Sequence, residues 1–188
     1  MKIDKDRLIA FTDAVIAIAA TIMVLELVNP HVPTLEGLAT QWPTFLAYLN
    51  SFAMIYLVWF KHNNLFHKFE NVSMRVFYMN GAWLFFLTLV PFATGWIGEF
   101  PFAPIPESSY ALILLLWTLS FELLDRQIIK ENPYLERDYY HKPKLRMFEY
   151  IGFIIAMIMA LIVPIHCLTI IFLISVVNLI ILGRKNKA

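Results

Sequence analysis

Long apolar runs alternate with short polar segments along the whole chain. Six of these runs reach the roughly 17–25 residues that a helix needs to cross the hydrocarbon core of a bilayer. They lie near Leu8–Val28, Thr44–Asn64, Arg75–Ile97, Ser108–Ile129, Met147–Val163 and Cys167–Gly183. The last two runs are joined only by Pro164, Ile165 and His166, which predicts a tight helical hairpin. The pattern predicts an all-α integral membrane protein with six transmembrane helices in one domain, residues 1–188.

The composition supports a membrane protein and excludes several other classes. The chain has 188 residues, 60% of them hydrophobic, and a mean hydropathy of +0.66, so a soluble domain of this size could not bury its apolar surface. A net charge of +1, without a basic patch interleaved with aromatic residues, gives no indication of a nucleic-acid partner. The single cysteine, Cys167, excludes an internal disulfide framework. We expect no cleavable signal peptide, because the first apolar run is long enough to span and no small-residue cleavage site follows it.

The basic residues indicate the topology. All 15 Lys and Arg residues fall on one side of the six-span arrangement, and the first, third and fifth loops contain none. By the positive-inside rule, both termini are then cytoplasmic. Miscounting one span would destroy this partition, so the partition supports the count. Within the third run, Pro91 predicts a kink.

A polar cluster opens the first apolar run. An Asp in a membrane helix costs about 2.5–3.5 kcal/mol at the helix centre and less near the interface, so it usually turns inward and finds a partner. Asp13 shares its helical face with Ala17 and Ala20, whose small side chains allow close helix approach, so we expect it to face the bundle. Arg7 and Thr12 are its candidate partners, although Arg7 would need a neighbouring helix or a bent side chain to pair with it. The alternative is that Asp13 lies at the headgroup level and is solvated.

An apolar stripe follows on the same run, at helical spacing. Ile18, Thr21, Ile22 and Leu25 form a candidate pore lining above an ionic anchor. The alternative is that the stripe faces lipid or the protein core, and Thr21 changes little because its hydroxyl can bond its own helix. Glu26 follows at the outer end, where it either attracts cations at a mouth or marks the interface.

Two further polar residues lie near the cytoplasmic ends of the next two runs. His62 lies at a depth comparable to that of Asp13, and a contact between them would satisfy both groups. The alternative is a histidine bound to water at the interface. Trp59, one turn earlier, is ordinarily a membrane anchor. Asn80, early in the third run, predicts a hydrogen bond between helices.

The remaining motifs give no support for catalysis or metal binding. Glu122 and Asp125, beside Arg126, are interpreted as interfacial residues at the end of the fourth run. The chain contains no T-V-G-Y-G filter, P-loop, dinucleotide fingerprint or H-E-x-x-H motif. His62 and His67 are five positions apart, which suits no common zinc spacing. We therefore expect no enzymatic activity, no cofactor and no metal site beyond transient potassium.

Taken together, these polar residues resemble the signature of a known family. The family is that of transmembrane protein 175, the endolysosomal potassium channels and their prokaryotic relatives, and the similarity extends over the whole six-span plan. The residues that carry it follow an R-x-x-x-F-S-D pattern in the first span, W-x-x-H in the second and Asn in the third: Arg7, Phe11, Thr12, Asp13, Trp59, His62 and Asn80. Thr12 replaces the usual Ser and keeps its hydroxyl.

The resemblance implies a homotetramer in the plasma membrane of a prokaryote, with the first helix of each subunit around a central pore. By position after the motif, Ile18 and Leu25 would form the apolar constriction with Thr21 between them, and Ile22 and Glu26 would be further lining positions. The seven motif residues would form a structural network that holds this helix. The implied function is passive, potassium-preferring conduction of monovalent cations across the lipid bilayer. Two alternatives are a proton-coupled secondary transporter that uses Asp13 and His62, and a non-conducting membrane scaffold.

Overall fold

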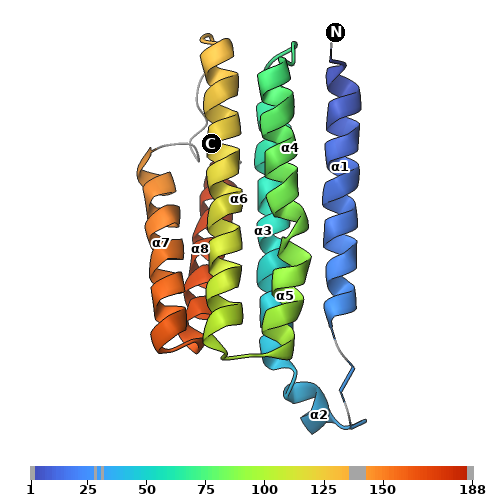
Figure 1. Ribbon diagram of the computed structural model, residues 1–188, viewed down its shortest axis with the longest axis vertical. Helices are drawn as coiled ribbons and strands as arrows, with labels where there is room; N and C mark the ends of the chain where they lie inside the picture. Colours follow the sequence, from blue (N-terminus) through green and yellow to red (C-terminus); the bar gives the residue numbers. More distant parts are fainter. Residues whose placement is uncertain (1–2, 28, 31, 136–142, 186–188) are drawn as a thin grey trace.

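The computed structural model of the chain describes residues 3–27, 29–30, 32–135 and 143–185. Its long helices lie side by side in one bundle, roughly along a common axis (Figure 1). The elements are α1 (Lys5–Ile22), η1 (Met23–Glu26), α2 (Leu35–Ala39), α3 (Trp42–Phe66), α4 (Met74–Thr88), α5 (Val90–Glu99), α6 (Pro104–Glu131), α7 (Pro143–Ile162) and α8 (Ile165–Lys185). Within the described ranges, an isolated bridge between Ile3 and Val72 is the only β-type pairing. The predicted all-helical architecture is confirmed.

Four segments are long and apolar enough to cross a membrane: Lys5–Glu26, Trp42–Phe66, Met74–Glu99 and Leu145–Ile162. These correspond to the predicted first, second, third and fifth spans. The described part of α8 contains a shorter apolar helix, His166–Ile181, and α6 is a helix of 28 residues beside them. The protein is therefore a multi-pass membrane protein, and the count of six spans stays a prediction.

The first span begins with a capped α-helix and ends in a 3-10 turn. The carboxylate of Asp4 caps α1 by accepting hydrogen bonds from the backbone N–H groups of Asp6 and Arg7. The α-helix ends at Ile22, and a tighter 3-10 turn continues through Glu26, so the predicted first span contains two helical forms. Val28 itself lies outside the described residues.

Proline marks the kink that the sequence predicts in the third span. Helix α4 ends at Thr88, and α5 begins at Val90 with Pro91 in its first turn. Proline lacks the N–H that an uninterrupted helix would need there, and its ring displaces the preceding turn. The predicted hairpin is also present, since α7 ends at Ile162 and α8 starts at Ile165.

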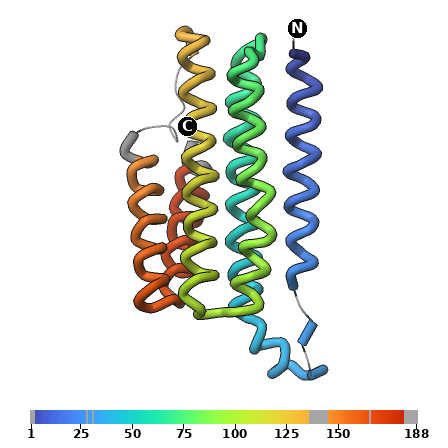
Figure 2. Tube along the Cα trace, viewed as in Figure 1, coloured from blue at the N-terminus to red at the C-terminus, as the bar shows by residue number. Residues whose placement is uncertain are grey.

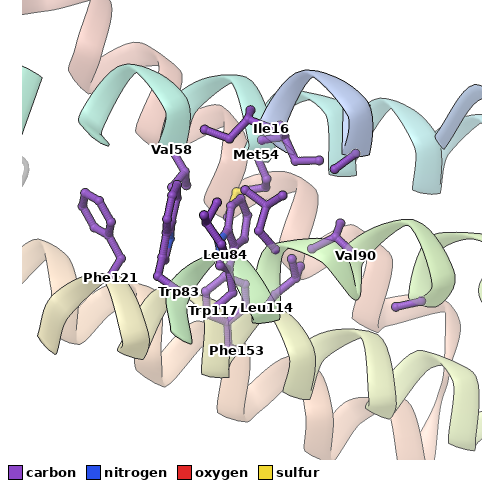
Figure 3. Packing of buried hydrophobic residues seen from close by; sticks show 14 of the residues in the cluster. Ile16, Met54, Val58, Trp83, Leu84, Val90, Leu114, Trp117, Phe121 and Phe153 are labelled. Atoms are coloured by element: carbon purple, nitrogen blue, oxygen red, sulfur yellow. The ribbon is translucent and has the colours of Figure 1, made fainter. Parts of the chain in front are cut away.

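Bulky aromatic side chains fill the centre of the bundle. Trp83 of α4 and Trp117 of α6 are both almost completely buried, with ring centroids 6.3 Å apart. Figure 3 shows this cluster, in which side chains from α1, α3, α4, α6 and α7 meet between the helices. The core lies to one side of α1, which packs on α3, α4 and α5 and forms one edge of the bundle (Figure 2). One face of α1 is therefore left without a partner among the residues that the structure describes.

The basic segments gather at one end of the bundle. The start of α1, the end of α3, the start of α4 and the end of α6 all lie at this end, as Figure 1 shows, while α2 lies at the other. This grouping is what the predicted topology requires. The side of the membrane that each end faces remains a prediction.

Candidate functional site

Helix α1 has one buried and one exposed face. The buried residues recur every three or four positions, which is the spacing of one face of an α-helix. They are Leu8, Thr12, Ile16, Ala19 and Met23. This face packs against α3, α4 and α5, so the rotation of α1 about its axis is fixed by the rest of the chain.

The predicted pore stripe lies on the opposite face. Ile18 is 56% exposed, Ile22 44% and Leu25 77%, although all three are large aliphatic residues. The hydroxyl of Thr21 donates to the carbonyl oxygens of Ala17 and Ile18, at 2.9 Å in both cases. Thr21 therefore satisfies its donor within α1 and needs no partner from another helix.

A buried hydrogen-bond chain joins α1, α3 and α4 near their basic ends. Asn80 of α4 is its centre, because its side-chain amide donates from Nδ2 to Thr12 Oγ1 at 2.9 Å. Its carbonyl Oδ1 pairs with Nε2 of His62 at 2.9 Å, so that ring nitrogen carries the proton. Thr12, His62 and Asn80 are each at most 1% exposed. The prediction that Asn80 bonds between helices is confirmed.

Asp13 binds α3 through a different side chain. The indole N–H of Trp59 donates to Asp13 Oδ1 at 3.0 Å, and both residues are half-buried. Asp13 is thus paired with α3, but the predicted small-residue face is not the packed face of α1: Ala17 is exposed, and the buried face carries Thr12 and Ile16. Trp59 acts here as a partner of the carboxylate, rather than only as a membrane anchor.

The predicted contact between Asp13 and His62 is wrong. The imidazole of His62 lies parallel to the rings of Phe66 and Trp83, with centroids 4.1 and 4.7 Å away. In this stacked position, Nε2 of His62 pairs with Asn80 of α4 and not with Asp13. The carboxylate of Asp13 therefore finds its partner in Trp59 instead.

Within a single subunit, Arg7 and Phe11 take no part in the hydrogen-bond network described above. Both side chains are exposed, and they line a cavity of 510 Å³ between the start of α1 and Phe77 of α4. Among the described residues, no side-chain hydrogen bond or ion pair is seen for the Arg7 guanidinium, and Asp13 does not accept from it. Their membership of the structural network stays a prediction.

A cluster of buried ionic side chains escaped the sequence analysis. The guanidinium of Arg146 on α7 contacts the carboxylates of Glu122 and Asp125 on α6, and all three are less than 10% exposed. Beside them, Lys61 Nζ lies 3.2 Å from Glu149 Oε1. The interpretation of Glu122 and Asp125 as interfacial residues is therefore wrong, because α7 covers them.

The sequence does carry a signal for this ionic cluster: two charged residues lie three positions apart on each of two helices. Glu122 and Asp125 share one face of α6, while Arg146 and Glu149 share one face of α7. The cluster joins these helices to α3 through Lys61, away from α1. Among the described residues, no group of three or more His, Cys, Asp or Glu side chains is placed to hold a metal ion.

Sequence comparisons identify relatives of this chain among known proteins. A family model described as "Endosomal/lysosomal potassium channel TMEM175" matches residues 7–91. The chain is 38% identical over 153 residues to the potassium channel HX13_20290 of a Chryseobacterium species, a match that covers 80% of this chain and 78% of that protein. It is 32% identical over 103 residues to the human endosomal/lysosomal proton channel TMEM175, which covers 48% of this chain but only 20% of the human protein.

A solved structure shares the fold. The crystal structure of a lysosomal potassium-selective channel TMEM175 homolog from Chamaesiphon minutus matches with a TM-score of 0.81 at 29% sequence identity. The match covers 94% of this chain and 96% of that one. The chain belongs to the TMEM175 family, whose members are membrane ion channels and not enzymes.

Proposed function

We propose that the chain forms a homotetrameric, passive, potassium-preferring cation channel with six membrane spans in each subunit and both termini cytoplasmic. The α1 helices of four subunits surround the conduction path. The observation that carries this proposal is the exposed aliphatic face of α1, which lies opposite a face held by buried hydrogen bonds. The names of the bacterial relatives, which are potassium channels, support the choice of ion.

The polar network supports the pore assignment because it fixes which face of α1 looks outward. Thr12 is bound by α4 and Asp13 by α3, so α1 cannot rotate to bury Ile18 without breaking both contacts. A helix that merely faced lipid would not need this restraint. The restraint holds Ile18 and Leu25 in one direction, as a narrow pore requires.

The physics of such a pore favours potassium over sodium modestly. Rings of Ile18 and Leu25 offer no oxygen atoms to replace the hydration shell of an ion. A cation that crosses them sheds part of its water, and potassium loses water more readily than sodium. Between the rings, Thr21 donates its proton to its own helix, which leaves hydroxyl lone pairs for water or a cation. A constriction of this kind also closes by dewetting.

The test is ion flux from proteoliposomes that contain the purified protein. We expect a potassium gradient alone to drive flux faster than a sodium gradient does. Ile18→Asn should wet the constriction, increase the flux and reduce the difference between the two ions. The matched control is Ile154→Asn, which makes the same change at a 43% exposed position of α7. Equal behaviour of Ile18→Asn and Ile154→Asn would reject the pore assignment.

Proton conduction is the second candidate, because animal relatives are named proton channels. Proton-coupled transport through an Asp13–His62 pair has less support, since each residue has a different partner. Flux that requires a proton gradient and disappears in Asp13→Asn would favour the transporter. If protons instead flow down their own gradient, and Ile18→Asn changes that flow, protons are among the ions that permeate the pore. The absence of any flux would favour a scaffold.

A further inference from the structure

A cavity of 520 Å³ lies beside the exposed face of α1, at the end away from the basic segments. Its walls come from the end of α1, η1 and α5, and they include Leu25 of the proposed constriction. The volume is within the range of about 300–1,000 Å³ that is typical of small-molecule sites. A ligand in this cavity would therefore sit at the edge of the conduction path.

The cavity carries negative charge. Glu26 from η1 and Glu99 from α5 both line it, and none of the lining residues is basic. Glu26 lies flat against α5 because position 95 is glycine: a Cβ atom there would be 2.0 Å from Glu26 Oε2. Gly95 thus makes room for the carboxylate at the cavity wall. The charge favours a cationic occupant.

An aromatic wall accompanies the two carboxylates. Phe92 and Trp96 are one turn apart on α5, with ring centroids 5.7 Å apart and planes tilted by 35°. Phe92 is 59% exposed, and Trp96 is half-buried. Aromatic faces attract organic cations through the ring quadrupole, and alkyl groups on the nitrogen add apolar contact. Fully hydrated potassium would gain little from these rings.

We propose that this cavity binds a quaternary ammonium compound and that the bound cation obstructs conduction. Its obstruction of current rests on the proposed pore, whereas its binding does not. The methyl groups of the ligand contact Phe92 and Trp96, and the carboxylates of Glu26 and Glu99 supply the opposite charge. Because the residues that line the cavity lie toward one end of the bundle, the ligand acts from one side of the membrane only.

The test uses choline and its neutral carbon isostere, 3,3-dimethyl-1-butanol, on potassium currents in planar bilayers. We expect choline to reduce the current from one compartment only, and the isostere to have no effect. Glu26→Gln and Trp96→Leu should each raise the half-blocking concentration about tenfold. The control, Glu36→Gln, removes an exposed carboxylate from α2 at the same end and should leave the block unchanged.

A direct binding measurement separates this proposal from the proposed channel. Calorimetry of choline with the detergent-purified protein should show binding that Gly95→Ala weakens, because the new methyl group displaces Glu26. Binding without any current in wild-type protein would reject the channel and keep the cavity assignment. Current that choline blocks equally in Glu26→Gln, Trp96→Leu and wild type would place the block elsewhere and overturn the proposal. Absence of both binding and block would overturn it as well.

Discussion

The indole N–H of Trp59 donates a hydrogen bond to Asp13 across 3.0 Å and so joins α3 to α1. One position earlier, Thr12 accepts from Asn80 of α4. Two adjacent residues of α1 are thus held by two different helices, in two different directions. Such an arrangement fixes both the rotation and the depth of α1, which a single contact would not do.

Removing the Trp59 donor should loosen α1. Trp59→Phe keeps an aromatic ring but leaves the half-buried carboxylate of Asp13 without its partner, at a cost between about 0.6 and 3 kcal/mol. We expect a lower melting temperature in detergent. Size-exclusion chromatography after heating to a series of temperatures provides the measurement. Trp42→Phe is the control, because Trp42 is 47% exposed and contacts Phe102 through its ring. An equal shift for both variants would contradict a specific role of the Trp59 N–H.

The Asn80 chain should behave as one unit. Asn80→Leu removes both bonds at once, whereas Thr12→Val removes only the acceptor on α1. In a double-mutant cycle on thermal stability, we expect a coupling of about 0.6–1.7 kcal/mol, between the average and the maximum measured for hydrogen bonds between membrane helices. Thr12→Ser keeps the hydroxyl and should be close to wild type. Strictly additive effects of Thr12→Val and Asn80→Leu would show that the bond contributes nothing.

Periodicity predicted the helices, because burial in a bundle repeats with the helical turn. It placed the packed face of α1 on Ala17 and Ala20, whereas the structure buries Thr12 and Ile16. The sequence also identified Thr12, Asp13, Trp59, His62 and Asn80 as polar residues near one end. It did not reveal which residue pairs with which. That choice depends on how α3 and α4 are rotated, and stacked aromatic rings around His62 decide the rotation.

The buried ionic cluster was missed for a related reason. Charged residues near the end of an apolar run look alike whether water or another helix covers them. Only the packing of α7 on α6 distinguishes the two cases, since it brings Arg146 onto Glu122 and Asp125. The hydrophobic periodicity also could not predict the 3-10 turn after Ile22, because the same residues suit either helical form.

Breaking this cluster should be severe. Arg146→Met removes the buried cation that contacts both Glu122 and Asp125, and breaking a buried ion pair typically costs about 3–5 kcal/mol. We expect little folded protein after purification, and recovery when Glu122→Gln and Asp125→Asn are added. Arg126→Gln serves as the control, because the Arg126 side chain is 64% exposed and its contact with Glu122 is worth about 0–1 kcal/mol. Normal yield of Arg146→Met alone would show that the cluster does not support the fold.

Arg7 lies on the same face of α1 as Ile18, about three helical turns away. Its guanidinium is exposed, and Phe11 lies between the two on this face. In the proposed tetramer, four Arg7 side chains therefore surround the cytoplasmic mouth. Their positive potential lowers the local concentration of cations that enter from this end.

Arg7→Gln should raise the potassium current that enters from the cytoplasmic end, by about two- to fivefold at ~0.02 M KCl. The gain should vanish near 1 M KCl, where the screening length falls to about 3 Å. Bilayer recordings at both salt concentrations provide the measurement. Lys130→Gln is the matched control, since it removes an exposed charge from the end of α6, on the other side of the bundle from α1. An increase that is independent of salt, or one that Lys130→Gln reproduces, would contradict a mouth position for Arg7.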